Sequence, residues 1–161
     1  MLAADIEMGM RAWLRTDSTL AAAGLNFYHG LEDDTQALPC VIAHAPGYEE
    51  HEIASTNGEV TVWVIVKSGA DRARPKQQLE DRRAAHVLLA DAVLARLRTF
   101  DLAEALNALA VSLGLAYTIY RPRQTAPQYF RGPAQFGIEE GRRNFRTAYQ
   151  LQFFCCDGQI T

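Results

Sequence analysis

The stretch EVTVWVIVKS at residues 59–68 decides the fold class, because it alternates like a β-strand and is apolar on both faces. Val62 and Val64 point to one face with two further valines, and Trp63 and Ile65 point to the other. A strand of this kind is typical of the centre of a sheet. We expect helices to cover one face and something else, such as another subunit, to cover the other.

Four other segments have the composition of strands. Residues 25–30 (LNFYHG) end at a glycine, and residues 38–45 (LPCVIAHA) open with a proline that fits only the start or the edge of a strand. Residues 115–123 (LAYTIYRPR) predict a third strand. Residues 142–156 (RRNFRTAYQLQFFCC) predict a fourth, with alternate positions apolar except at Thr147. The predicted sheet core comprises Val62, Trp63, Val64, Phe145, Leu151 and Phe153.

Apolar residues recur at helical spacing in three places. Residues 2–22 carry one apolar stripe, with a cap at Asp17 and a stop at Gly24. Residues 101–114 begin with the capping-box spacing at Asp101 and end at a glycine. The longest helix is expected over residues 79–98, with a buried face made of Ala85, Leu88, Leu89, Ala92 and Ala95 or Arg96.

The order of these elements is helix, two or three strands, a pair of helices, and two or three strands. A chain of 161 residues is the size of one domain and can bury its own core. We therefore expect a single α+β domain over residues 1–161, with a mostly antiparallel, mixed β-sheet and helices packed on one face. Residues 124–141 are rich in glycine and proline and predict a long loop or assembly arm, with room for one short strand near Phe136.

Composition excludes several classes of protein. Hydrophobic residues make up 48% and charged residues 22% of the chain, a balance typical of a folded globular protein. The apolar stretches are too short or too interrupted by charge to cross a bilayer, and the N-terminus lacks the pattern of a signal peptide. The three cysteines, Cys40, Cys155 and Cys156, have no CxxC spacing and fit a reducing cytosol as packing residues.

The sequence contains no recognisable reactive constellation. It has neither a GxSxG elbow nor a glycine-rich phosphate loop, and its four histidines occur in unrelated contexts. His44 and His51 lie near Glu49, Glu50 and Glu52, but this spacing matches no metal-ligand signature, and a solvated acidic loop is the commoner explanation. We predict no catalytic residue, no cofactor and no metal.

Charge is unevenly distributed along the chain, whose formal net charge is −3. Residues 1–70 hold ten acidic and three basic residues, whereas residues 71–161 hold nine acidic and thirteen basic ones. One fold can interleave these charges into a mixed surface; alternatively, an acidic and a basic face meet between neighbouring copies. The candidates for a subunit interface or a DNA-facing lumen are Arg72, Arg74, Lys76, Arg121, Arg123, Arg131, Arg142, Arg146, Glu32, Asp33 and Asp34.

Four of these arginines form a predicted cluster. Arg121 and Arg123 alternate on one strand, and Arg142 and Arg146 share a face of another, so the four side chains project together if the strands are neighbours. Such a cluster is a solvated face that keeps an edge soluble, a wall paired with acids of the adjacent subunit, or a contact to DNA phosphate. Net acidity argues against free nucleic-acid binding as the main task.

In the order of its helices and strands and in the local sequence pattern of each, the chain resembles the tail-terminator and related minor tail or head-tail joining proteins of long-tailed bacteriophages. The resemblance covers nearly the whole length. After an N-terminal helix come the strand segments LNFYHG, ALPCVIAHAPG and GEVTVWVIVKSGADR, the long helix EDRRAAHVLLADAVLARL, and the final strand RRNFRTAYQLQFFCC. The second helical piece and residues 124–141 are additions to the pattern of the shorter members.

The resemblance implies a structural virion protein and not an enzyme. Its subunits are expected to form a ring, with six copies, that caps the completed tail tube, stops tube polymerisation and provides the head-tail joining surface. The implied partners are copies of itself, the tail tube protein and head-tail connector or neck proteins, with non-specific contact to genomic DNA in the lumen left open and no membrane. The protein is then assembled in the host cytoplasm and resides in the tail or neck of the virion. The alternatives are another neck protein, a small nucleic-acid-binding or regulatory α+β module, and an enzyme with an unrecognised pocket.

Overall fold

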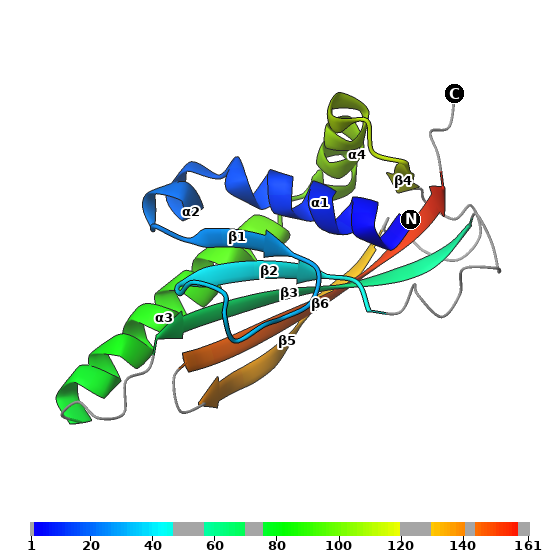
Figure 1. The fold of residues 1–161 in the computed structure, drawn as a ribbon. Helices are drawn as coiled ribbons and strands as arrows, with labels where there is room; N and C mark the ends of the chain where they lie inside the picture. The colour runs from blue at the N-terminus through cyan, green and yellow to red at the C-terminus, as the bar shows by residue number, and fades with distance from the viewer. Residues whose placement is uncertain (1, 47–56, 70–75, 120–129, 141–143, 158–161) are drawn as a thin grey trace.

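A twisted, mixed β-sheet forms the centre of the protein (Figure 1). The structure is a computed structural model that describes residues 2–46, 57–69, 76–119, 130–140 and 144–157. The strand order is β1-β2-β3-β6-β4, with β5 also paired to β6; β1 runs parallel to β2, and the other described pairs are antiparallel. The strands are β1 (Asn26–His29), β2 (Cys40–His44), β3 (Asn57–Gly69), β4 (Tyr117–Ile119), β5 (Phe130–Glu140) and β6 (Asn144–Asp157).

The two longest strands, β3 and β6, lie side by side at the centre of this sheet. They pair from Asn57 opposite Cys156 to Gly69 opposite Asn144. Trp63 is half-buried on the face of β3 that points away from the main core. The other five residues of the predicted sheet core are buried on these two strands: Val62, Val64, Phe145, Leu151 and Phe153.

The helices pack against one face of the sheet (Figure 1). They are α1 (Leu2–Arg15), α2 (Ser18–Ala22), α3 (Lys76–Leu97) and α4 (Leu102–Leu113). The cluster buried on the opposite face consists of strand residues, namely Cys40, Ile42, Ile65 and Ala148. The predicted fold class, an α+β domain with a mixed sheet and helices on one face, is confirmed. None of the helices in the described ranges is long and apolar enough to cross a membrane.

The predicted buried face of the longest helix is right in part. Leu89 and Ala92 of α3 are half-buried and pack against the core. Leu88, however, is 71% exposed, and Ala85 and Ala95 are exposed as well. The buried side chains of α3 include His86, Ala90, Val93, Leu94 and Leu97. The first buried residue of this face is a histidine. Because histidine is polar, the spacing of apolar residues alone favoured a neighbouring face of the helix.

Residues 130–140, expected to belong to a long loop with one short strand near Phe136, form the eleven-residue strand β5. The composition of these residues did not predict a strand, because glycine and proline are rare in regular strands. The pairing of β5 with β6 shifts register twice, once across Pro133 and once across Gly137. Irregular edge strands accommodate both residues at such bulges.

Local sequence signals for helix ends hold at three of four places, including Gly24, which follows α2 with a φ of 71°. Asp17 caps α2 by accepting the Leu20 N–H at 2.9 Å, and Gly114 ends α4 in the left-handed conformation with φ of 68°. The capping box predicted at Asp101 does not form. The side chain of Asp101 makes no cap hydrogen bond, and its backbone carbonyl accepts the Ala105 N–H at 2.9 Å.

Two buried tyrosines tie the helices to the sheet. Tyr149 on β6 donates its hydroxyl to the Ala90 carbonyl of α3 at 2.8 Å, and Tyr117 on β4 donates to the Leu106 carbonyl of α4 at 2.7 Å. Burial raises the pKa of both phenols, that of Tyr149 to about 12. Gly9 of α1 makes room for Tyr117, because a Cβ added at residue 9 would overlap the phenol oxygen.

A side chain closes the edge of β4. The Asn107 amide of α4 donates to the Ile119 carbonyl at 2.9 Å, and its oxygen accepts the Ile119 N–H at 2.8 Å. The Ala116 N–H, just before β4, donates to the Asp5 carboxylate of α1 at 2.8 Å. These side chains take the place that a further strand would occupy beside β4.

Candidate interaction site

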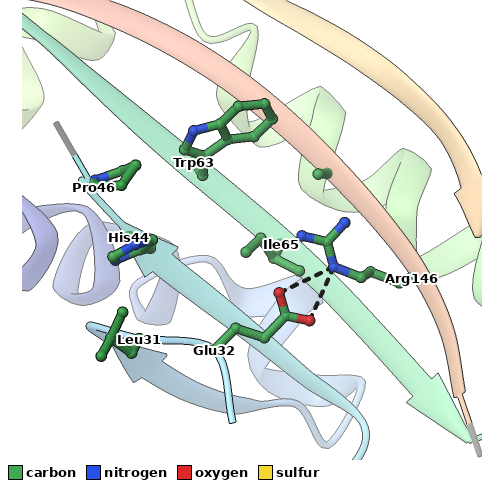
Figure 2. Close-up of a pocket in the computed structure, with 8 residues that line it drawn as sticks. Leu31, Glu32, His44, Pro46, Trp63, Ile65 and Arg146 are labelled. Atoms are coloured by element: carbon green, nitrogen blue, oxygen red, sulfur yellow. Dashed lines mark hydrogen bonds and ion pairs between the residues drawn. The ribbon is translucent and has the colours of Figure 1, made fainter.

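The sheet face opposite the helices carries a groove of about 400 Å³. Figure 2 shows the Ile65 side chain between the Trp63 ring and the pair formed by Glu32 and Arg146. Most of the lining residues are apolar. The lining comes from β2 and the residues just after it, from β3 and β6, and from the segment between β1 and β2. The lining comprises Leu31, Glu32, His44, Pro46, Trp63, Ile65, Arg146 and Ala148.

A cluster of three charged side chains lies at one end of this groove. The Nε of Arg146 donates to both carboxylate oxygens of Glu32, at 2.9 and 3.1 Å, and the Lys67 ammonium lies 3.5 Å from the same carboxylate. Strand pairing places the two cations together, because Lys67 on β3 and Arg146 on β6 are direct register partners. Lys67 is only 3% exposed, and Glu32 offsets the cost of burying its charge.

The pKa of the Glu32 carboxyl is lowered below its usual value. Burial by itself raises this pKa, but the hydrogen bond from Arg146 and the charges of Arg146 and Lys67 together outweigh burial. Glu32 is therefore ionised at neutral pH. A depressed pKa stabilises the fold above the unfolded value of 4.5, and that contribution is lost as the pH falls below it.

The segment that carries Glu32 is fixed by hydrogen bonds of its own. Asp33 accepts the Thr35 N–H at 2.7 Å, and hydrogen bonds from Thr35 lower the pKa of the Asp33 carboxyl. The Tyr28 hydroxyl accepts the Ala37 N–H at 3.2 Å. Glu32 therefore reaches Lys67 and Arg146 from an ordered connection between β1 and β2.

The other end of the groove adjoins α1. The Nδ1 of His44 lies 3.3 Å from Oε1 of Glu7, without hydrogen-bond geometry, and the same oxygen accepts the Ala45 N–H at 2.7 Å. Glu7 is 7% exposed, so its carboxylate depends on such donors. These contacts hold the end of β2 against the first helix.

The buried His86 was not among the predicted site residues. Its Nδ1 lies 2.7 Å from the Ser68 hydroxyl and its Nε2 lies 2.8 Å from the Thr147 hydroxyl, so both ring nitrogens have partners. His86 and Thr147 are fully buried, and Ser68 is 8% exposed. Serine and histidine serve nucleophilic catalysis where a substrate can reach them, but this cluster is sealed in the core and is structural. In the sequence, this cluster was indicated only by Thr147, the one polar residue in the alternating apolar series of residues 145–155.

The structure brings together part of the predicted interface set. Glu32 and Arg146 bind each other within one chain, so for this pair the attraction expected between copies is satisfied internally. Asp33 and Asp34 are exposed beside Glu32. Of the remaining cations, Lys76 opens α3 and Arg131 lies on β5, whereas Arg72, Arg74, Arg121, Arg123 and Arg142 lie outside the described residues.

Only one arginine of the predicted cluster, Arg146, lies within the described residues, so the cluster stays a prediction. The described part of the strand expected to carry Arg121 and Arg123 is β4, which pairs with Cys155, Cys156 and Asp157 of β6.

No group of three or more histidine, cysteine, aspartate or glutamate side chains is placed to hold a metal ion in the part of the chain that the structure describes. His51 and the glutamates around it lie outside that part. Cys40, Cys155 and Cys156 are free thiols buried in the protein, and burial raises the pKa of Cys40 to about 11. A thiol with a raised pKa is a poor nucleophile and a poor ligand, which agrees with a packing role.

The fold and the groove define a small α+β domain with helices on one sheet face and an apolar groove on the other. A scan of the chain against protein-family models gives no match, and a search of curated proteins gives no match either. The groove and the residues around it therefore carry the functional conclusion.

Proposed function

We propose that this chain is a ring-forming structural subunit, the tail terminator of a long-tailed bacteriophage. In this role, copies of the protein close into a ring on the end of the tail tube, with six copies as the expected number. The ring stops tube polymerisation and offers a joining surface to the head. The protein then acts in the tail or neck of the virion, after assembly in the host cytoplasm, and catalyses no reaction.

One observation supports this proposal above all: the helices occupy one face of the sheet, and the other face keeps an apolar groove at Trp63 and Ile65. A closed ring requires two different, complementary patches on each subunit. The groove is suited to be one of them. Its carboxylate, Glu32, is ionised and bound to two cations, so it is not poised to transfer a proton.

The mass of the purified protein, measured alone and in the presence of tail tubes, tests the ring. A closed ring, or a monomer that assembles only on tubes, supports the proposal. Tube length in electron micrographs then separates a terminator from another neck protein. Removal of a terminator should give overlong tubes, whereas removal of a neck protein should leave tube length unchanged.

A stable monomer under both conditions would contradict the ring. If that monomer binds duplex DNA with an affinity that falls steeply with salt, the protein is a nucleic-acid-binding module instead.

A further inference from the structure

We propose that Phe100 of one copy docks in the groove of the next copy, so that the ring closes head to tail. This contact rests on the ring-forming function proposed above and specifies its interface. Phe100 lies in the turn between α3 and α4, which pack on one sheet face, and the groove lies on the opposite face. Two different patches on opposite sides of a subunit are what a heterologous contact requires.

The turn presents the Phe100 side chain on a fixed backbone. Phe100 is fully exposed, while Leu97 and Leu102 on either side are fully buried. The Leu102 N–H donates to the Thr99 carbonyl at 3.3 Å, and the Thr99 hydroxyl donates to the Arg96 carbonyl at 2.7 Å. An aromatic ring held in water by an ordered turn contributes binding energy at low entropic cost when a partner covers it.

The groove is suited to receive such a ring. Trp63 and Ile65 provide an apolar floor, and Leu31, which is 77% exposed, provides an apolar rim. Its volume of about 400 Å³ is that of a site for a small molecule, and one aromatic side chain fits within it. Pairing of Phe100 with Trp63 would add the favourable contact of two aromatic rings.

The charges beside the two patches are complementary. Arg98 is exposed two residues before Phe100, and Asp33 and Asp34 are exposed beside the rim of the groove. Asp101, exposed on the other side of Phe100, has the sign that suits the cationic end of the groove. Opposite charges steer two surfaces into one orientation. These matched signs favour a second copy of this chain as the occupant over an uncharged apolar ligand.

Thiol crosslinking tests the contact even where the assembly is short-lived. The variant L31C/D101C keeps Phe100 and changes an exposed neighbour whose side chain makes no cap hydrogen bond. Treated with a short bis-maleimide, it should give a ladder of covalent oligomers, whereas L31C and D101C alone should stop at dimers. The natural cysteines are buried, and the unmodified chain measures their background. The matched control is L31C/L88C, because Leu88 is also strongly exposed but lies on α3 away from the proposed contact. Equal ladders from both pairs would overturn the proposal.

Self-association of F100S gives an independent test. Because Phe100 is fully exposed, F100S should keep the melting temperature of the parent and weaken self-association about tenfold or more. The control L88S should leave both the melting temperature and self-association unchanged. R98E should weaken association as well, and the added change D34R should restore it. If F100S assembles as well as the parent, the contact is wrong and the ring stands. If the parent never assembles, the ring itself is wrong.

Discussion

The Nε2 atom of His86 in α3 lies 2.8 Å from the hydroxyl oxygen of Thr147 in β6, inside the protein core. The Ser68 hydroxyl of β3 is hydrogen-bonded to the other ring nitrogen, so one imidazole connects α3, β3 and β6. A slip of one residue between β3 and β6 would turn Thr147 to the opposite face of the sheet. The cluster therefore fixes the position of the helix and the register of the central strands together.

The variant Thr147→Val should lower the free energy of unfolding by about 1–3 kcal/mol, because it keeps the side-chain shape but leaves a buried ring nitrogen without a partner. Urea denaturation measures this loss. Thr61→Val, at a half-buried position on the other face of β3, is the matched control and should change stability by less than about 0.5 kcal/mol. Equal losses in the two variants would show that the bond to His86 adds nothing.

The stability of the protein should fall with pH below about 6.5 because of His86. Burial lowers the pKa of this histidine below its ordinary value of 6.5. The folded protein keeps the ring neutral, whereas the unfolded chain takes up a proton, so the contribution is complete above pH 6.5 and declines below it. Thermal melting across this range measures the decline. His86→Gln should be less stable but should show a shallower dependence on pH, and an unchanged dependence would contradict the assignment.

The variant Gly9→Ala should destabilise the protein by about 1–3 kcal/mol, although alanine normally favours a helix over glycine. The reason is steric, because the added Cβ would overlap the ring of Tyr117. Chemical denaturation measures the sign of the change. Tyr117→Phe removes the overlapped oxygen, so the double variant should lose less stability than the sum of the two single losses. Strict additivity would mean that the two residues do not meet.

Replacement of Asn107 by leucine should release the edge of β4. The change removes both hydrogen bonds to Ile119, so the Ile119 amide should exchange with solvent deuterium faster than in the parent. Glu104→Gln, at an exposed position on the same helix, is the control and should leave that exchange rate unchanged. An unaltered rate in the leucine variant would place the protection of Ile119 elsewhere.

Elements with a regular local pattern could be predicted from the sequence. The alternation of apolar residues in β3 and β6, the cap at Asp17 and the stop at Gly114 are all properties of short windows. The buried face of α3 could be predicted only in part, because the hydrogen-bond partners of His86 are Ser68 and Thr147, which lie 18 and 61 residues away along the chain. Strand β5 was not predicted in full, because it contains Pro133 and Gly137, and local composition does not reveal the bulges that accommodate them.

The groove was less predictable than the fold. Trp63 and Ile65 were expected on the second face of the sheet, and that part followed from alternation in β3. The position of Glu32 could not be predicted in this way. Its hydrogen bond to Arg146 spans 114 residues and depends on where the connection between β1 and β2 lies. The charge distribution left open whether acids and bases pair within one fold or between copies. For Glu32 the pairing lies within the chain, because the register of β3 and β6 places Lys67 and Arg146 side by side.

The amide of Asn107 sets a boundary on how these molecules can associate. Because it occupies the N–H and the carbonyl of Ile119, a neighbouring molecule cannot prolong the sheet past β4 by forming a ladder there. Growth of amyloid-like ribbons through that border therefore requires the Asn107 side chain to give up both hydrogen bonds first.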